Sequence, residues 1–176
     1  MTQYTIEISE CRISKITDHK FLDQVIRRVL SEEKIAIATI SLALVNDAEI
    51  HEVNRQFLGH DYPTDVISFR LNEPLHSSSV VRICSAGEVC ADSFGGVDRR
   101  SSDAIDGELI VSTQTAIREA SAHGWSPKAE LVLYVVHGLL HLCGYDDTTA
   151  EARPVMRSRE RDLLAIWGFC PTGLES

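Results

Sequence analysis

The strongest constraint on the fold of this chain is the segment Leu131–Leu142 (LVLYVVHGLLHL), which is apolar on nearly every side of a helix. A helix without a polar face must be covered by other parts of the protein on all sides. Ser126 and Pro127 precede the segment in the order of a helix N-cap and a first helical residue, and Gly144 follows it as a stop signal. The sequence therefore predicts a buried helix between Pro127 and Gly144.

Two histidines lie inside this apolar helix. His137 and His141 are four residues apart, which places both imidazoles on one face, one turn apart and directed at a common point. Two neutral imidazoles can share a zinc ion there, with bonds of about 2.0–2.1 Å. The alternative is a pair of hydrogen-bonded core histidines. The glycine turn and the acidic residues that follow the helix favour the metal.

A third ligand is expected just past the helix, where Gly144 reverses the chain. Asp146 and Asp147 each offer a carboxylate oxygen, and the alternative for either one alone is helix capping before Thr148. Cys143 is two residues from His141 and projects elsewhere if the helix continues. The sequence thus predicts a two-histidine site completed by Asp147 or Asp146.

The word HGLLH differs from the HExxH motif of zinc peptidases. Gly138 occupies the position at which those enzymes carry their general-base glutamate. This departure counts against peptidase chemistry, although Glu108 is another carboxylate that could act as a base.

The rest of the chain mixes helices and strands without strict alternation. We expect a fold of the α+β class, in which a small mixed four-stranded sheet packs with about five helices, in a single layer around the buried metal-bearing helix. A polar stretch at 73–105 is long for a loop in a compact domain, so we expect one domain over 1–176 with a mobile insertion there, in which Val80–Val89 has strand-forming character. Besides the buried helix, the expected helices are Asp18–Leu30, Asp47–Leu58 with Asp47 as its cap, Thr113–Ala122 and Ala150–Trp167, and the expected strands are Tyr4–Ser9, Ile35–Val45, Asp65–Leu71 and Glu108–Ser112.

The net charge of −9 excludes binding to nucleic acid by bulk charge. An RNA substrate would need a local basic patch to meet its phosphates. Arg153, Arg157 and Arg161 recur every fourth residue on the last helix and form a candidate RNA-binding stripe. The alternative is an ordinary solvated face, because acidic residues such as Glu160 lie nearby.

Cysteine usage and hydropathy indicate a cytoplasmic protein. The five cysteines are scattered and no two have CxxC spacing, as in a chain whose thiols stay free in a reducing compartment. The N-terminal residues lack the pattern of a signal peptide, and no apolar run is long enough to span a bilayer. We expect neither a membrane partner nor a nucleotide cofactor.

Three segments resemble one known family. Residues 137–147 (HGLLHLCGYDD) resemble the signature HGxLHLxGYDH of the YbeY family of RNA-processing endoribonucleases. Residues 54–69 (NRQFLGHDYPTDVISF) are similar to the family pattern Nxx[YF]RxxDxPTDVLSF, and residues 107–112 (GELIVS) to its GDIvIS strand. The resemblance covers roughly Ile35 to Trp167.

The resemblance implies a metal-dependent, single-strand-specific endoribonuclease that matures ribosomal RNA, takes part in ribosome biogenesis and works with the ribosomal subunit. It also implies one zinc ion on His137, His141 and Asp147, with His137 and His141 as catalytic residues and a free coordination position. An alternative is a non-catalytic, ribosome-associated metal-binding factor, and another is a metallohydrolase acting on a substrate such as a peptide.

This chain departs from the family pattern at two positions. Asp147 stands where the family has its third histidine, and its harder oxygen ligand can alter metal choice. Leu58 stands where the family has an arginine. Arg55, three residues earlier and expected on nearly the same helical face, is then the candidate catalytic arginine, and Arg70 is another candidate for holding phosphate.

Overall fold

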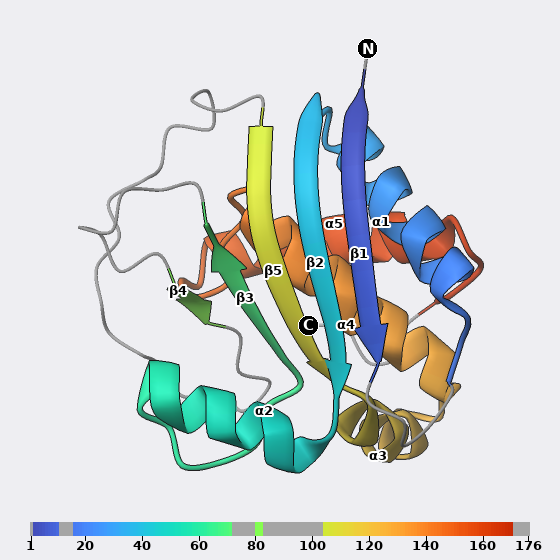
Figure 1. The fold of residues 1–176 in the computed structure, drawn as a ribbon. Helices are drawn as coiled ribbons and strands as arrows, with labels where there is room; N and C mark the ends of the chain where they lie inside the picture. Colours follow the sequence, from blue (N-terminus) through green and yellow to red (C-terminus); the bar gives the residue numbers. More distant parts are fainter. Residues whose placement is uncertain (1, 11–15, 72–79, 83–103, 171–176) are drawn as a thin grey trace.

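The computed structural model describes residues 2–10, 16–71, 80–82 and 104–170 (Figure 1). They form a mixed sheet flanked by helices. The strands are β1 (Gln3–Glu10), β2 (Ile37–Val45), β3 (Val66–Arg70), β4 (Val80–Arg82) and β5 (Ala104–Ser112). The helices are α1 (His19–Glu32), α2 (Asp47–Val53) with its π-helical continuation η1 (Asn54–Leu58), α3 (Thr113–His123), α4 (Pro127–Leu142) and α5 (Ala152–Ala165).

The sheet has the strand order β1-β2-β5-β3-β4. The strands β1, β2 and β5 run parallel to one another, whereas β3 runs antiparallel to both β5 and β4. The expected α+β class with a mixed sheet is confirmed. The described sheet contains one strand more than the four expected, because Val80–Arg82, within the polar stretch, pairs with the edge of β3.

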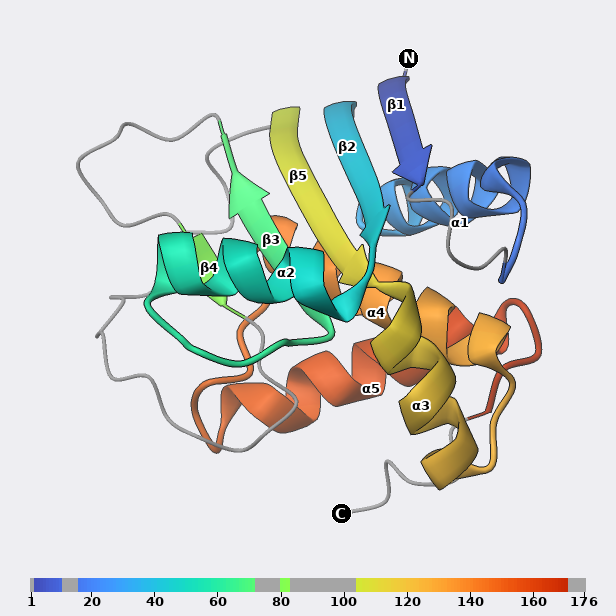
Figure 2. The ribbon, with the colours of Figure 1, turned by 60° about the horizontal axis from the view of Figure 1, so that its bottom comes forward.

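The larger core lies between the sheet and α4. Side chains from α1, α4 and α5 pack there against one face, to which Leu109 and Val111 of β5 point. Ile110 points to the opposite face, where it packs with Ile50 of α2 and Leu58 of η1. The helices therefore cover both faces, and not one layer only as expected; α2 and α4 lie on opposite sides of the sheet (Figure 2).

The buried apolar helix is present as predicted. The Ser126 side chain caps α4 by accepting a hydrogen bond of 3.1 Å from the Ala129 amide, and Pro127 begins the helix. Most α4 side chains are buried, among them Leu131, Leu139 and Leu140. A rigid helix held from several sides is a suitable platform for a site that needs fixed geometry.

Two local predictions need correction. The cap of α2 is Asn46 and not Asp47, because Asn46 and Glu49 form a reciprocal capping box. The strand that follows the polar stretch is also longer than expected. β5 begins at Ala104, inside the stretch 73–105, whereas the expected strand began at Glu108. Residues 72–79 and 83–103 lie outside the described residues, so the mobile insertion and the single domain stay predictions.

Candidate metal centre

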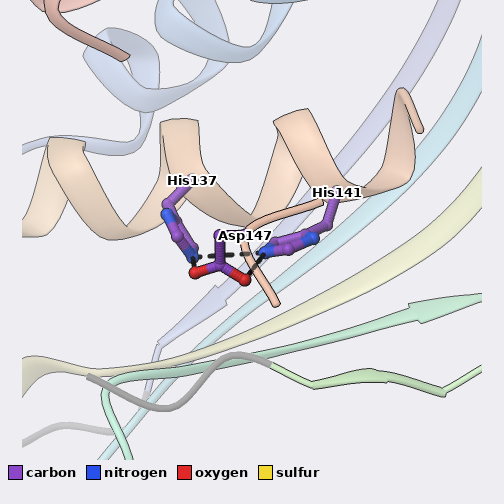
Figure 3. A group of neighbouring side chains, drawn as sticks. All are labelled: His137, His141 and Asp147. Carbon is purple, nitrogen blue, oxygen red and sulfur yellow. Dashed lines mark hydrogen bonds and ion pairs between the residues drawn. The ribbon is translucent and has the colours of Figure 1, made fainter. Parts of the chain in front are cut away.

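Three electron-donating side chains converge beside α4. The Nε2 atoms of His137 and His141 are 3.3 Å apart. The Asp147 carboxylate faces both, with Oδ2 at 3.8 Å from His137 Nε2 and Oδ1 at 3.6 Å from His141 Nε2 (Figure 3). The ligand atoms of the three residues all lie within 4.8 Å of one another.

The outer nitrogen of each imidazole faces an acceptor. His137 Nδ1 donates to a carboxylate oxygen of Glu160, and His141 Nδ1 donates to the Tyr145 carbonyl at 3.0 Å. A neutral imidazole carries one proton, so both inner Nε2 atoms present lone pairs. Two lone pairs and a carboxylate that face one another at this distance repel unless a cation lies between them.

The spacing of these atoms fits a tetrahedral zinc ion. Bonds of about 2.0–2.1 Å at tetrahedral angles place neighbouring ligand atoms about 3.3–3.4 Å apart. The observed separations, 3.3 Å between His137 and His141 and 3.6–3.8 Å from them to Asp147, are close to this value. The donor set therefore fits one divalent ion with three protein ligands.

The turn after α4 brings Asp147 back to the histidines. Gly144 adopts a φ of +90°, a left-handed conformation that favours glycine, and the Tyr145 amide donates to the Leu140 carbonyl at 3.0 Å. The Arg153 guanidinium of α5 then holds the Asp147 carbonyl, with 3.0 Å from Nε to the oxygen. The position of Asp147 thus depends on both the turn and α5.

Tyr145 ties the same turn to α1. Its hydroxyl donates to Glu33 at 3.0 Å, and Arg159 of α5 donates to the other oxygen of Glu33 at 2.6 Å. Three helices therefore hold the loop that carries the third ligand.

The cluster is buried on one side and open on the other. The side chain of His141 is 1% exposed, whereas those of His137 and Asp147 are 16% and 26% exposed. The rings neither diverge nor lie sealed in the core. A three-ligand site that solvent reaches is the pattern of a catalytic metal rather than of a structural one.

Burial and mutual charge set the pKa values of the cluster in the absence of a cation. Burial and the charge of His137 lower the pKa of His141 to about 3. Burial lowers the pKa of His137, but the hydrogen bond and charge of Glu160 outweigh it, and the net pKa is raised. Burial also raises the pKa of Asp147. The cluster thus holds one imidazole that resists protonation and another that favours it.

The structure separates the candidates for the third ligand. Asp146 turns away and caps the next turn, with 3.0 Å from Oδ1 to the Thr148 amide and 2.7 Å from Oδ2 to the Thr148 hydroxyl. Cys143 ends α4 outside the group, and burial raises the pKa of its thiol to about 12. Asp147 completes the group. Glu108 lies in β5 opposite Phe69.

Two predictions concern arginines, namely Arg55 near Leu58 and the stripe on the last helix. Leu58 is 6% exposed, whereas Arg55 is exposed and pairs with Glu52. The expectation that Arg55 shares a face with Leu58 is wrong, because this turn is π-helical and its hydrogen bond spans five residues, from the Gly59 amide to the Asn54 carbonyl. The Arg153, Arg157 and Arg161 stripe lies on α5, and its Arg153 end adjoins Asp147.

Sequence reasoning missed two buried carboxylates near the site. Glu160 contacts His137 directly, and Asp65, which precedes β3, is 5% exposed and has a pKa that burial raises and the charge of His137 lowers in part. A signal for Glu160 was available. It falls in the apolar row of α5 formed by Met156, Leu163 and Leu164, where a lone carboxylate is out of place.

An α+β fold that brings two imidazoles and a carboxylate to one solvent-reachable point defines a class, that of candidate metalloenzymes with an open metal position. The model of the family described as endoribonuclease YbeY matches residues 3–168. The chain belongs to this family. The resemblance of the three segments is thereby confirmed, and with it the enzyme class, an RNA-cleaving hydrolase.

Curated relatives named endoribonuclease YbeY match most of the chain. The relative from Halalkalibacterium halodurans is 37% identical over 153 residues, which cover 84% of this chain and 87% of the relative. That from Bacillus licheniformis is 32% identical over 172 residues, 96% of this chain and 94% of the relative. A relative from Rhodopirellula baltica is 39% identical over 135 residues, 74% of this chain and 55% of that longer protein.

A solved structure supports the fold. The solution structure of TM1509 from Thermotoga maritima matches with a TM-score of 0.51 and 25% identity, covering 93% of this chain and 91% of that one. Within the described part of the chain, no helix combines the length and the apolar character needed to cross a bilayer.

Proposed function

We propose that this protein is a metal-dependent, single-strand-specific endoribonuclease that acts in ribosomal RNA maturation and ribosome biogenesis. The observation that carries the metal dependence is the convergence of two Nε2 lone pairs and the Asp147 carboxylate at zinc-like spacing. Membership of the YbeY family carries the RNA cleavage. Zinc is the proposed metal, because two imidazoles and one carboxylate form a common zinc ligand set.

The protein's own residues divide the work. A zinc ion bound here would activate water and polarise a phosphoryl oxygen. His137, His141 and Asp147 would hold the ion, and the open side, where His137 and Asp147 are partly exposed, would be the side from which the scissile phosphate approaches. The dry wall behind His141 strengthens the electrostatic interactions within the site.

Arg153 is the proposed first contact for RNA phosphate beside the metal. Its Nε holds the Asp147 carbonyl, which fixes the guanidinium next to the metal site while the side chain stays exposed. Arg157 and Arg161 continue along α5 and extend the proposed RNA contact. In a protein with a net charge of −9, such a local row is what attracts a polyanion. Arg55 remains a predicted catalytic residue.

The proposed partners are ribosomal RNA and the ribosomal subunit, and the proposed compartment is the cytoplasm. The resemblance to the YbeY family supports the proposed partners, and the free cysteines expected from the sequence support the proposed compartment. They are tested by co-sedimentation of the protein with ribosomal particles and by fractionation of cells that produce it.

A cleavage assay tests the proposal. The zinc-loaded protein is incubated with single-stranded RNA, with a matched duplex RNA and with a chelator. We expect cleavage of the single strand only, its loss with the chelator or in His137→Ala, and its recovery when zinc is returned to the wild type.

One observation favours the non-catalytic alternative. Leu58 stands at the position of the family arginine and is buried against Ile50, Ile67 and Ile110. An arginine side chain in its place would disturb that apolar cluster. Association with ribosomal particles without cleavage by the zinc-loaded protein would support this alternative and refute the nuclease.

A further inference from the structure

Glu160 is a carboxylate on the buried face of its helix. It lies on α5 and is 3% exposed, in a row with the apolar side chains of Met156, Leu163 and Leu164. A buried carboxylate is costly unless it is paired and hydrogen-bonded. Glu160 contacts His137 Nδ1, on α4, so the contact joins two helices at the metal site.

The two ends of the His137 ring meet different surroundings. Nδ1 faces Glu160, whereas Nε2 faces His141 Nε2 at 3.3 Å and the Asp147 carboxylate at 3.8 Å. A carboxylate cannot donate a proton while ionised, so it requires the ring proton on Nδ1. The Nε2 lone pair is thereby directed at the point where the donors converge.

His141 reaches the same arrangement by another route. Its Nδ1 is held by the backbone carbonyl of Tyr145, which is neutral and does not depend on the side chain at that position. Of the two contacts, only that of Glu160 brings a side chain with a full negative charge.

We propose that Glu160 is a positioning residue of the metal centre. It fixes the proton of His137 on Nδ1, orients the ring, and strengthens Nε2 as a donor through its charge. Such outer partners of ligating histidines are worth about 10- to 100-fold in metal affinity. The inference rests on the metal site of the proposed function. The competing explanation is structural, with Glu160 serving only to join α5 to α4.

Zinc affinity without RNA tests the role. The full-length metal-free protein is titrated with zinc against a chromophoric chelator. Glu160→Gln keeps an acceptor oxygen but loses the charge, and Glu160→Leu loses both. We expect zinc binding about 10-fold weaker in Glu160→Gln and approaching 100-fold weaker in Glu160→Leu. Asp162→Asn, the same chemical change at an exposed position of α5, is expected to bind zinc as the wild type does.

A second readout separates positioning from joining. The nitrogen-15 chemical shifts of the His137 ring, measured in the metal-free protein at a pH at which the ring is neutral, report which nitrogen carries the proton. We expect Nδ1 to carry it in the wild type and the proton to distribute over both nitrogens in Glu160→Leu. Wild-type zinc affinity in Glu160→Gln, or wild-type ring shifts in folded Glu160→Leu, would overturn the proposal.

His137→Ala in the same titration distinguishes the two levels of inference. Loss of zinc binding in His137→Ala together with wild-type affinity in Glu160→Gln overturns only the role of Glu160. Retention of zinc binding by His137→Ala overturns the metal site itself, and the role of Glu160 with it.

Discussion

The backbone of Gly138 lies directly against Leu109. A Cβ atom added at Gly138 would be 2.8 Å from Leu109 Cδ2 and 3.2 Å from Val66 Cγ2. At the position that carries the general base in HExxH peptidases, a side chain would therefore have to displace the ends of Leu109 and Val66. Glycine at this position lets α4 pack closely against β3 and β5, and it supplies no carboxylate for the peptidase chemistry.

Gly138→Ala is therefore expected to lower both stability and zinc affinity. Overpacking of a filled core costs about 1–3 kcal/mol, and either the Leu109 side chain or the helix must shift to relieve it. Urea unfolding and a zinc titration measure the two effects. Ile40→Val in β2 is the control, because it costs about 1 kcal/mol in the same core without touching α4's glycine. Zinc affinity falling equally in both variants would contradict the explanation.

Asp147→Ala is expected to weaken zinc binding by more than about 100-fold, since loss of an outer partner alone costs 10- to 100-fold. Asp146→Ala is the matched control. Its carboxylate caps Thr148 and lies outside the ligand group, so only a small loss of stability is expected. Metal analysis after dialysis and a chelator competition compare the two. Equal loss in both variants would mean that the turn, and not the ligand, is what matters.

Asp47 makes stability depend on pH. Burial raises its pKa, but hydrogen bonds from Ser112, Thr115 and Arg118, of 2.5, 2.7 and 2.8 Å, outweigh burial, so the pKa lies below the usual 3.8. A group with a lowered folded pKa contributes its stability above the unfolded pKa and loses it as the pH falls through the folded value.

The metal-free Asp47→Asn variant is therefore expected to be less stable than the metal-free wild type by about 1–2 kcal/mol at pH 7, with a gap that narrows below about pH 4. Urea unfolding at pH 7 and at pH 3 measures this difference in stability. Asp23→Asn, which removes only a surface pair with Arg27, is expected to change stability by less than about 0.5 kcal/mol. A gap that is the same at pH 7 and pH 3 would show that the charge of Asp47 plays no part.

Arg153→Ala is expected to weaken the binding of single-stranded RNA and to reduce its salt dependence. Loss of one phosphate contact lowers the slope of log K against log salt by about 0.7 for a single strand. Binding is measured in a His137→Ala background, which prevents cleavage. Arg28→Ala on α1, which removes an exposed arginine paired with Glu32, serves as the control. Arg55→Ala belongs in the same series. A slope unchanged by Arg153→Ala would remove it from the RNA contact.

The sequence was most informative where one helix decides the geometry. The i,i+4 spacing on an apolar helix predicted that His137 and His141 converge, because nothing but the helical repeat is needed. The choice between Asp146 and Asp147 could not be made from the residues alone, since two adjacent carboxylates in a turn differ only in direction. That direction is set by the φ of Gly144 and by Arg153. The guanidinium of Arg153, six residues after Asp147, holds the Asp147 carbonyl.

Contacts between distant elements were harder to predict. Asn46 and Asp47 are both good capping residues. In the structure Asn46 caps α2, and Asp47 accepts a hydrogen bond from Ser112 of β5, 65 residues away. The face of Arg55 could not be predicted from α-helical spacing, because Asn54–Leu58 forms a π-helical turn. Glu160 meets His137 across 23 residues, a pairing that only the packing of α5 on α4 creates.

The order of these elements along the chain has a consequence for biosynthesis. Both imidazoles are made before Asp147, and Asp147 before α5, whose Arg153 and Glu160 hold the loop and aim the ring. A nascent chain emerges from its N-terminus onward. A nascent chain that has not yet released α5 presents His137, His141 and Asp147 without Glu160 and Arg153, so we expect it to bind the ion more weakly than the complete chain does.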